Sequence, residues 1–204
     1  MSKLRRIVLV RHGETVGNSS VRFHGSGDVA LSDEGRRQMR DAAFRLRSEV
    51  FDLVMASPLQ RSWEAAWVAS GGASVRLEAD FREVHFGRWE GLTKEEIEAS
   101  DPILFADWQS KREGFEYPSG ELRADFHGRV ERGLSRLLDS GASRALLVVH
   151  KGVIRIIAEK LLGEPLAGGE PELGSAIGLS RGGDGSWSRG RRGSNPPALD
   201  ERAA

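Results

Sequence analysis

The chain has 204 residues, which is enough for one domain with a sizeable core. Its 30 Lys and Arg residues balance its 30 Asp and Glu residues, so the charge gives no indication of a nucleic-acid partner or an anionic membrane partner. The absence of cysteine excludes disulfides, thiolate nucleophiles and cysteine metal sites. No stretch approaches the length of a membrane span or of a signal-peptide core, so we expect a cytoplasmic protein with no membrane partner. The sequence leaves the oligomeric state open.

An apolar run over residues 7–10 predicts a buried β-strand that ends abruptly in Arg11, His12 and Gly13. Open α/β sheets bind their ligands at the carboxyl ends of the strands. Arg11 would offer a planar fork to an anion, and Gly13 would let the backbone approach a ligand closely. A lone histidine after a strand is more often an ordinary polar loop residue, so the stretch needs support from the rest of the chain.

The next helix is predicted to begin after Ser32, which is typical of an N-cap residue and is followed by acidic residues in the first turn. Residues at helical spacing predict its buried face: Met39, Ala43, Leu46 and Val50.

Residues 52–56 predict a second strand. Ser57 and Pro58 then fit an N-cap and a first helical position, which places Arg61 near the first turn of a helix. A guanidinium beside a helix N-terminus favours an anion, although a solvated arginine is the plainer interpretation. We interpret Trp63 and Trp67, four residues apart, as core packing.

Residues 122–137 predict a long helix. Its buried stripe is expected to comprise Leu122, Phe126, Val130, Leu134 and Leu137. His127 lies off that stripe and is expected at the surface. Near the end of the chain, residues 176–179 and the region of Trp187 predict a β-hairpin around a glycine-rich turn.

Residues 144–149 repeat the design of the first strand, because this apolar run ends in His150. Lys151 and Gly152 then open a helix that is predicted to reach Leu162. Histidines that end two neighbouring parallel strands would meet above the same edge of the sheet. This recurrence is the strongest indication, from the residues alone, that His12 and His150 belong to one catalytic site.

The run Arg11-His12-Gly13-Glu14-Thr15 resembles the signature of the histidine phosphatase superfamily, which includes the cofactor-dependent phosphoglycerate mutases. The resemblance implies an α/β fold of the phosphoglycerate mutase type: a three-layer α/β/α sandwich with a mostly parallel central sheet. It also implies that His12 is phosphorylated during turnover. We expect a single domain over residues 1–195 and a mobile C-terminal tail over residues 196–204.

Two further segments resemble phosphate-binding and substrate-binding motifs of this family. Residues 57–61 resemble its second motif, whose arginine, here Arg61, binds the transferred phosphoryl group. Asn18 stands at the spacing of a phosphate-contacting asparagine. Residues 22–28 resemble its substrate loop, which makes Gly25 and Ser26 candidate substrate contacts, although the same loop also reads as a plain surface connection.

The third motif, over residues 81–91, supplies the candidate proton donor, because Glu83 matches the family's acid. An alkoxide is a poor leaving group, so a carboxyl group beside the leaving oxygen is what the chemistry requires. With Arg11, Arg61 and His150 holding the phosphoryl oxygens, this set predicts metal-independent hydrolysis of phosphomonoesters with no cofactor and no metal site.

Other positions bear on the choice between a phosphatase and a mutase. Lys94 stands where the mutases have a substrate-contacting lysine, whereas Phe86 lacks the hydroxyl group of their tyrosine. The 67-residue separation of Glu83 from His150 is short for a mutase and typical of the phosphatase branch. Two residues in this interval are further candidate substrate contacts, Lys111 and Arg112.

We therefore favour a phosphatase that acts on a small phosphorylated metabolite, with a phosphoprotein substrate left open. One alternative is phosphoglycerate mutase-type transfer. The other is a non-catalytic phosphate-binding or scaffold protein, and its only support is Lys151, which stands where the family usually has a small residue. Lys151 is also a candidate substrate contact, because it would add positive charge to the pocket.

Overall fold

Six strands form one sheet in the order β3-β2-β4-β1-β5-β6. The computed structural model describes residues 2–190, in which β1 pairs in parallel with β4, β4 with β2, and β2 with β3, while β5 and β6 run antiparallel at one edge. The strands are β1 (Arg6–Arg11), β2 (Leu53–Ala56), β3 (Arg76–Leu77), β4 (Arg144–Val149), β5 (Ala176–Arg181) and β6 (Trp187–Arg189). The predicted mostly parallel sheet and the predicted terminal hairpin are both confirmed.

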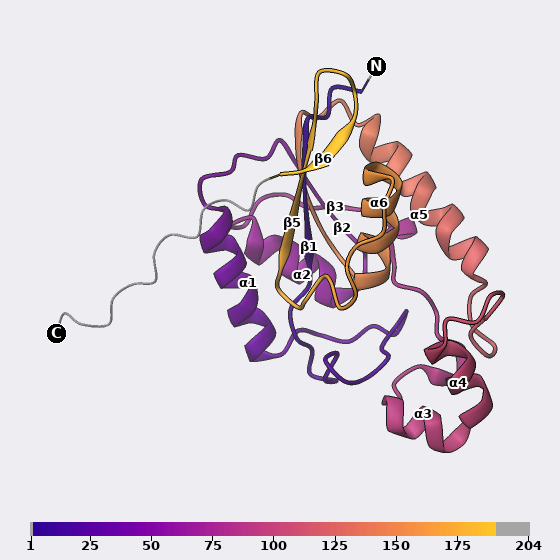
Figure 1. Ribbon diagram of the computed structural model, residues 1–204. Helices are drawn as coiled ribbons and strands as arrows, with labels where there is room; N and C mark the ends of the chain where they lie inside the picture. The colour runs from indigo at the N-terminus through magenta and orange to yellow at the C-terminus, as the bar shows by residue number, and fades with distance from the viewer. Residues whose placement is uncertain (1, 191–204) are drawn as a thin grey trace, which may run out of the picture.

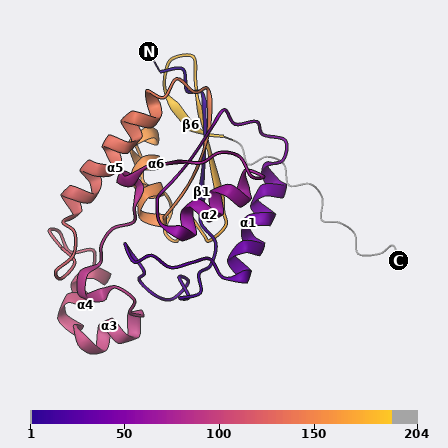
Figure 2. The same cartoon turned by 180° about the vertical axis from the view of Figure 1, so that it is seen from behind.

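Helices cover both faces of this sheet (Figures 1 and 2). On one face lie α1 (Asp33–Leu46) and α2 (Gln60–Ala69), and on the other lie α5 (Arg123–Leu138) and α6 (Lys151–Leu162). The residues of β1 alternate between the two cores, as the twofold repeat of a strand requires: Ile7 and Leu9 face the α5–α6 side, and Val8 and Val10 face the α1–α2 side. The predicted three-layer α/β/α sandwich is therefore confirmed.

The register of β1 and β4 positions the two candidate catalytic histidines. Arg11 pairs with Val149, so the next residue of each strand, His12 and His150, leaves the sheet at the same edge. Both strands are buried along most of their length, which leaves the strand ends as the places where polar side chains emerge.

The helix predicted after Ser32 forms as expected, because the Ser32 hydroxyl accepts a hydrogen bond from the N–H of Gly35. The predicted buried face extends too far, however. Val50 lies beyond the end of α1 and is 75% exposed. At the start of α5, Leu122 is the N-cap residue and is 55% exposed, so it does not belong to the buried stripe.

The prediction for α2 was wrong in two respects. The helix begins at Gln60 with Leu59 as the N-cap, and Ser57 instead accepts a hydrogen bond from the N–H of Leu59. Trp63 and Trp67 are 42% and 56% exposed. The buried side of α2 is lined mainly by small residues, which lets the helix lie close to the sheet and turns both tryptophans outward: Ser62, Ala65, Ala66 and Ala69.

A smaller lobe projects beyond the sheet, where α3 (Lys94–Ser100) and α4 (Pro102–Gln109) pack on an aromatic core of their own (Figure 1). Trp89 is fully buried at the centre of this lobe, and its indole N–H donates to Asp101 at 3.0 Å. A capping box between Thr93 and Glu96 begins α3. This lobe forms one wall of the candidate site described below.

Within residues 2–190, no helix is long and apolar enough to cross a membrane. The last residues of the predicted domain, 191–195, and the predicted tail, 196–204, lie outside the described residues.

Gly13 lies where β1 meets α1 and carries a testable constraint. A Cβ atom at this position would lie 2.4 Å from the carbonyl oxygen of Gly35, so the close approach is to the start of α1 rather than to a ligand. We expect Gly13→Ala to lower the free energy of unfolding by about 1–3 kcal/mol in urea titrations, because the backbone of α1 must shift.

Gly168→Ala is the matched control, since no atom lies within 4 Å of its added Cβ. It should change stability by less than about 0.5 kcal/mol. Equal stabilities for the two variants would contradict the steric account.

Candidate active site

A cavity of about 900 Å³ opens at the carboxyl ends of β1 and β4. Its floor is formed by polar residues that follow these strands, and its walls come from residues 19–25, the α3–α4 lobe and the first turns of α5 and α6. Eight of the candidate site residues line it together: Arg11, His12, Gly25, Arg61, Glu83, Lys94, Lys111 and Lys151. His150 contacts this group from beneath, through the ring of His12.

His12 is buried, and its Nδ1 lies 2.7 Å from the carbonyl oxygen of Gly13. A carbonyl oxygen only accepts, so this contact assigns the ring proton to Nδ1 and leaves the lone pair on Nε2. Burial holds the pKa of His12 well below its usual value, and the positive charges of Arg61 and Arg11 add to the effect. At neutral pH His12 is therefore a neutral imidazole with one nucleophilic nitrogen.

His150 lies beside His12, with the ring centroids 5.2 Å apart and the rings inclined at 65°. Burial again lowers its pKa well below the usual value, followed by the charge of Arg61. Within residues 2–190, neither ring nitrogen has a hydrogen-bond partner. Buried polar atoms are normally paired, so these nitrogens point to a polar group that binds between the rings and the cavity.

Two guanidinium groups flank the histidines. Arg61 is buried and donates to the carbonyl oxygens of Gly27 and Gly25 at 2.6 and 2.5 Å. Arg11 donates to the carbonyl oxygen of Pro171 at 3.0 Å, and its Nε–H is buried with no partner within the described part of the chain. Burial lowers the pKa of both groups, yet an arginine stays charged at neutral pH.

Glu83 is buried at the first turn of α6, and main-chain groups hold its carboxylate. Oε1 accepts from the N–H of Val84 at 3.0 Å, and Oε2 accepts from the N–H of Gly152 at 2.9 Å. A Cβ atom on Gly152 would lie 2.4 Å from Oε1, so a larger residue here would displace the carboxylate of Glu83.

The substrate-loop residues are placed differently from one another. Gly25 lines the cavity. Ser26 does not, because its N–H and hydroxyl donate to Glu90 at 3.0 and 3.3 Å. Asn18 is exposed, has a φ of 59° and is also absent from the cavity wall. The contacts predicted for Asn18 and Ser26 stay predictions.

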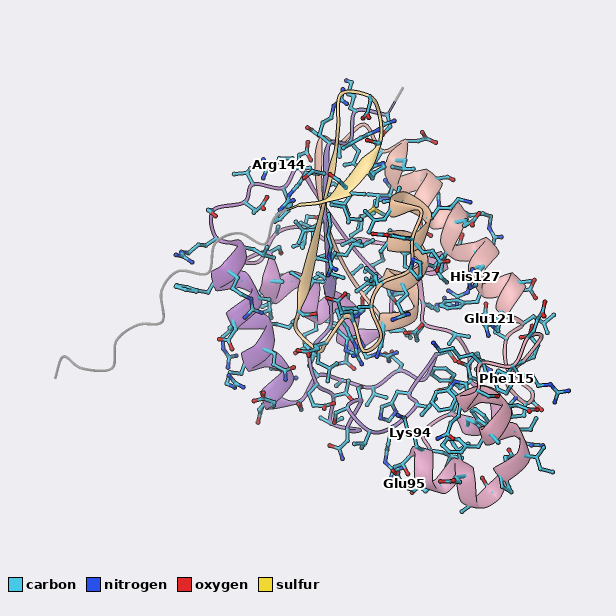
Figure 3. The ribbon with its side chains drawn as sticks, in the orientation of Figure 1. Lys94, Glu95, Phe115, Glu121, His127 and Arg144 are labelled. Atoms are coloured by element: carbon cyan, nitrogen blue, oxygen red, sulfur yellow. The ribbon has the colours of Figure 1, made fainter. Side chains whose placement is uncertain are left out.

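Three lysines also line the cavity: Lys94, Lys111 and Lys151. The ammonium of Lys94, which is labelled in Figure 3, lies 5.8 Å from the ring centre of Trp108. Lys111 lines the cavity, whereas Arg112 turns away and pairs with Asp107 at 2.8 Å. Lys151 is partly buried, and burial followed by the charge of Arg11 lowers its pKa.

Several residues of the cavity wall are not predicted by the sequence. Aromatic side chains from the small lobe and the substrate loop face the cavity, among them Phe23, Trp108, Phe115 and Tyr117. Arg123 and His127 reach it from α5 and Arg155 from α6; His127 is exposed, as predicted, and yet lies on the rim (Figure 3). One signal was available, because Arg155 is four residues after Lys151 and so shares its helix face.

The cavity concentrates positive charge in a chain whose formal net charge is zero. Among residues 2–190, three carboxylate residues line it: Glu83, Glu159 and Glu172. Eight Arg and Lys residues line it: Arg11, Arg22, Arg61, Lys94, Lys111, Arg123, Lys151 and Arg155. Such a site attracts anions. Within residues 2–190, no group of three or more His, Asp or Glu side chains is arranged to hold a metal ion.

Comparison with known proteins agrees with this geometry. The family profile described as histidine phosphatase superfamily (branch 1) matches residues 7–179. The chain belongs to the histidine phosphatase superfamily. The predicted resemblance is thereby confirmed, and so are the predicted hydrolase class and the phosphatase activity on phosphomonoesters.

Named relatives of this histidine phosphatase act on different substrates. A glucosyl-3-phosphoglycerate phosphatase of Mycolicibacterium vanbaalenii is 34% identical over 175 residues, covering 80% of this chain and 77% of the relative. An adenosylcobalamin/α-ribazole phosphatase of Salmonella typhimurium is 32% identical over 165 residues, covering 79% and 82%. The structure of a mycobacterial glucosyl-3-phosphoglycerate phosphatase matches with a TM-score of 0.76 and 30% identity, covering 91% of this chain and 96% of that one.

The buried histidines generate a prediction about stability and pH. Both pKa values are lowered in the folded state, so below about pH 6.5 the unfolded chain binds protons that the folded chain does not. Stability should therefore fall as the pH drops from about 6.5, by up to about 1.4 kcal/mol per pH unit for each histidine, and be independent of these groups above it.

Urea unfolding at pH values from 5.0 to 8.0 tests this, because the carboxylates with lowered pKa values, such as Glu49 and Glu78, lose their contribution only at lower pH. In His150→Asn, the slope of the free energy of unfolding against pH should decrease below pH 6.5 by the contribution of one histidine. An unchanged slope in that variant would refute the assignment.

Proposed function

We propose that His12 is the nucleophile of this phosphatase and that Glu83 is its proton donor. The observation that carries the proposal is the state of His12: a neutral imidazole, its Nδ1–H engaged by Gly13, lies between Arg11 and Arg61 in an anion-attracting cavity. Nucleophilic catalysis needs an unprotonated nitrogen, and phosphoryl transfer needs cations around the transferred group.

In the first step, Nε2 of His12 attacks phosphorus opposite the ester oxygen. The N–P bond forms as the P–O bond to the alcohol breaks, and Glu83 in its protonated form gives its proton to the departing oxygen. Arg11 and Arg61 neutralise the charge on the remaining phosphoryl oxygens. His150 contributes a ring N–H to one of these oxygens, which gives its unpartnered nitrogen a role.

In the second step, Glu83 is a carboxylate and takes a proton from water. The oxygen of that water attacks the phosphorus of phosphohistidine, the N–P bond breaks, and inorganic phosphate leaves with the electron pair restored to Nε2. The enzyme returns to its starting state, with Glu83 protonated and His12 neutral. The two main-chain hydrogen bonds to Glu83 keep one carboxyl group in place for both steps.

We propose a small phosphorylated metabolite with a further anionic group as the substrate. Two relatives are named as a glucosyl-3-phosphoglycerate phosphatase and an adenosylcobalamin/α-ribazole phosphatase, and both names refer to small-molecule substrates. The aromatic wall offers an apolar surface to the body of such a molecule, and Lys94 and Lys151 offer charge beyond the phosphoryl site. Phe86, which lines the same wall without a hydroxyl group, does not favour mutase-type transfer. A cytoplasmic location stays a prediction.

Hydrolysis of 4-nitrophenyl phosphate in EDTA tests the nucleophile. His12→Ala should lose at least about a thousandfold of kcat, because the phosphohistidine cannot form. Acid-labile incorporation of label from a radioactive phosphate ester should appear in the native protein alone. Residual turnover of the variant at the native rate would show that another group is the nucleophile.

Lys151 provides the test of substrate class. Lys151→Met should raise KM about tenfold for phosphomonoesters that carry a carboxylate, since a charge-assisted contact contributes about 1.5–3 kcal/mol, and leave 4-nitrophenyl phosphate nearly unchanged. Arg112→Met is the matched control, because Arg112 pairs with Asp107 away from the cavity. An equal effect on both kinds of substrate would argue against a second anionic group.

A further inference from the structure

Arg129 of α5 has a guanidinium group in which every N–H has an acceptor. Its side chain is only 14% exposed. Nε and Nη2 donate to the two carboxylate oxygens of Glu121 at 2.6 and 2.8 Å. Nη1 donates to the carbonyl oxygens of Asp80 and Arg82 at 2.9 and 2.5 Å, and Nη2 donates to the carbonyl oxygen of Glu83 at 3.0 Å. These five bonds use all five donors of the group.

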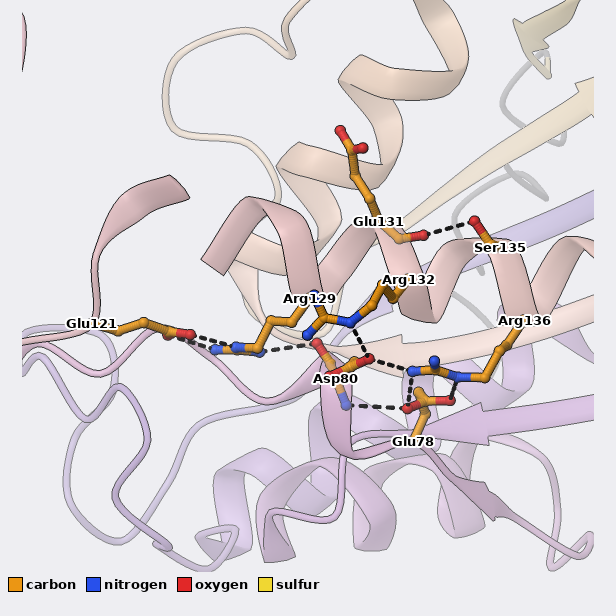
Figure 4. A network of polar contacts seen from close by, with 8 residues as sticks. All are labelled: Glu78, Asp80, Glu121, Arg129, Glu131, Arg132, Ser135 and Arg136. Carbon is orange, nitrogen blue, oxygen red and sulfur yellow. Dashed lines mark hydrogen bonds and ion pairs between the residues drawn. The ribbon is translucent and has the colours of Figure 1, made fainter. Parts of the chain in front are cut away.

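The three carbonyl groups belong to the segment that delivers Glu83 to the cavity. Figure 4 shows Arg129 between Glu121 on one side and Asp80 on the other. Glu121 extends the restraint past Glu83, because its N–H donates to the carbonyl oxygen of His85 at 2.9 Å, and its Oε2 accepts from the N–H of His85 at 3.4 Å. Residues 80–85 are thus held on both sides of the proposed proton donor.

This restraint matters because two main-chain N–H groups, those of Val84 and Gly152, orient the carboxylate of Glu83. The clearance at Gly152 is small, since even a Cβ there would lie 2.4 Å from Oε1. A shift in the backbone of Glu83 therefore moves its carboxylate away from the leaving oxygen or against α6. Misplacement of a catalytic group by about 1 Å costs about a hundredfold in rate.

We propose that Arg129, locked by Glu121, is a positioning residue that sets the place of Glu83 for proton transfer. The proposal rests on the proposed role of Glu83. It assigns a function to a buried ion pair that touches neither of the histidines nor the phosphoryl-binding arginines among its hydrogen-bond partners.

Arg136, two turns further along α5, provides a matched control. It also binds acidic residues of the same segment, the carboxylates of Glu78 and Asp80. Its hydrogen bonds go to side chains three or more residues before Glu83, and none reaches the carbonyl groups of residues 82 or 83. Figure 4 shows that both arginines bind Asp80, Arg129 through its main-chain carbonyl oxygen and Arg136 through its carboxylate. Loss of Arg136 therefore weakens the packing of this segment without releasing Glu83.

The experiment compares two leaving groups, because proton donation matters only where the leaving oxygen is basic. The 4-nitrophenolate of 4-nitrophenyl phosphate is a good leaving group that needs little protonation. The leaving group of 2-phosphoglycerol is a basic alkoxide that needs a proton. We expect Arg129→Met to lower kcat/KM about a hundredfold for 2-phosphoglycerol and less than about tenfold for 4-nitrophenyl phosphate. Arg136→Met should lower both by less than about threefold, at a comparable loss of thermal stability.

Glu83→Gln separates the inference from the function on which it rests. This variant should show the same selective loss as Arg129→Met, only larger. If Glu83→Gln affects the two substrates equally, the proposed role of Glu83 is wrong and the proposal falls with it. If Glu83→Gln is selective and Arg129→Met is not, the proposed function stands and the positioning role is overturned.

Two milder variants keep the test decisive where Arg129→Met fails to fold. Arg129→Lys keeps the charge but has three donors for five acceptors, and Glu121→Gln keeps the shape of the partner while removing its charge. Both should give a selective loss smaller than that of Glu83→Gln, with circular dichroism and melting close to those of the native protein. If the ratio of kcat/KM for 2-phosphoglycerol to kcat/KM for 4-nitrophenyl phosphate is that of the native protein in both variants, the proposal is overturned.

Discussion

The parallel pairing of β1 with β4 is the constraint on which the site depends. Because Arg11 is in register with Val149, the next residue of each strand leaves the sheet at the same level. That single register brings His12 and His150, which are 138 positions apart in sequence, to a ring separation of 5.2 Å. A slip of one residue would turn the side chains of one strand to the opposite face and separate the two rings. β1 and β4 are buried along most of their length, so their packing against the helices on both faces of the sheet fixes the register against such a slip.

Burial then determines the charge state of this centre. The two imidazoles are neutral because burial and two neighbouring guanidinium groups both oppose protonation. The guanidinium groups remain charged, and main-chain carbonyl oxygens of Gly25, Gly27 and Pro171 accept part of their donors. The remaining Nε–H of Arg11 and the nitrogens of His150 have no partner among residues 2–190. The fold thus keeps donors oriented before an anion arrives, so that little reorganisation is needed when charge develops on phosphorus.

The sequence predicts the strand ends well because hydrophobic runs that stop at a charged residue have few other interpretations. It predicts helix faces less well, as α2 shows. The spacing of Trp63 and Trp67 indicates that they share a face, but periodicity does not say which face is buried. Small residues on the other side decide it, because they allow α2 to approach the sheet closely.

The wall of the cavity could not be predicted, since it depends on contacts between segments far apart in the chain. Phe115 and Arg155 meet the same cavity only after the small lobe and α6 have packed. Arg129 is a different case. It is three residues after Phe126, so it lies at the edge of the stripe that the sequence assigns to the core. A charged residue beside an apolar stripe predicts a buried partner, and the sequence alone could not show that the partner was the backbone around Glu83.

The α5 helix consequently serves both the core and the chemistry. Its apolar stripe packs on the sheet, while Arg129 between those apolar residues binds the segment that carries Glu83. The α6 helix meets the same carboxylate from the other side through the N–H of Gly152. The position of Glu83 therefore depends on how α5 and α6 pack against each other and against the sheet, and not only on the loop that contains it. A loop residue held in this way can be a precise proton donor, because the rigid layers around it supply the precision.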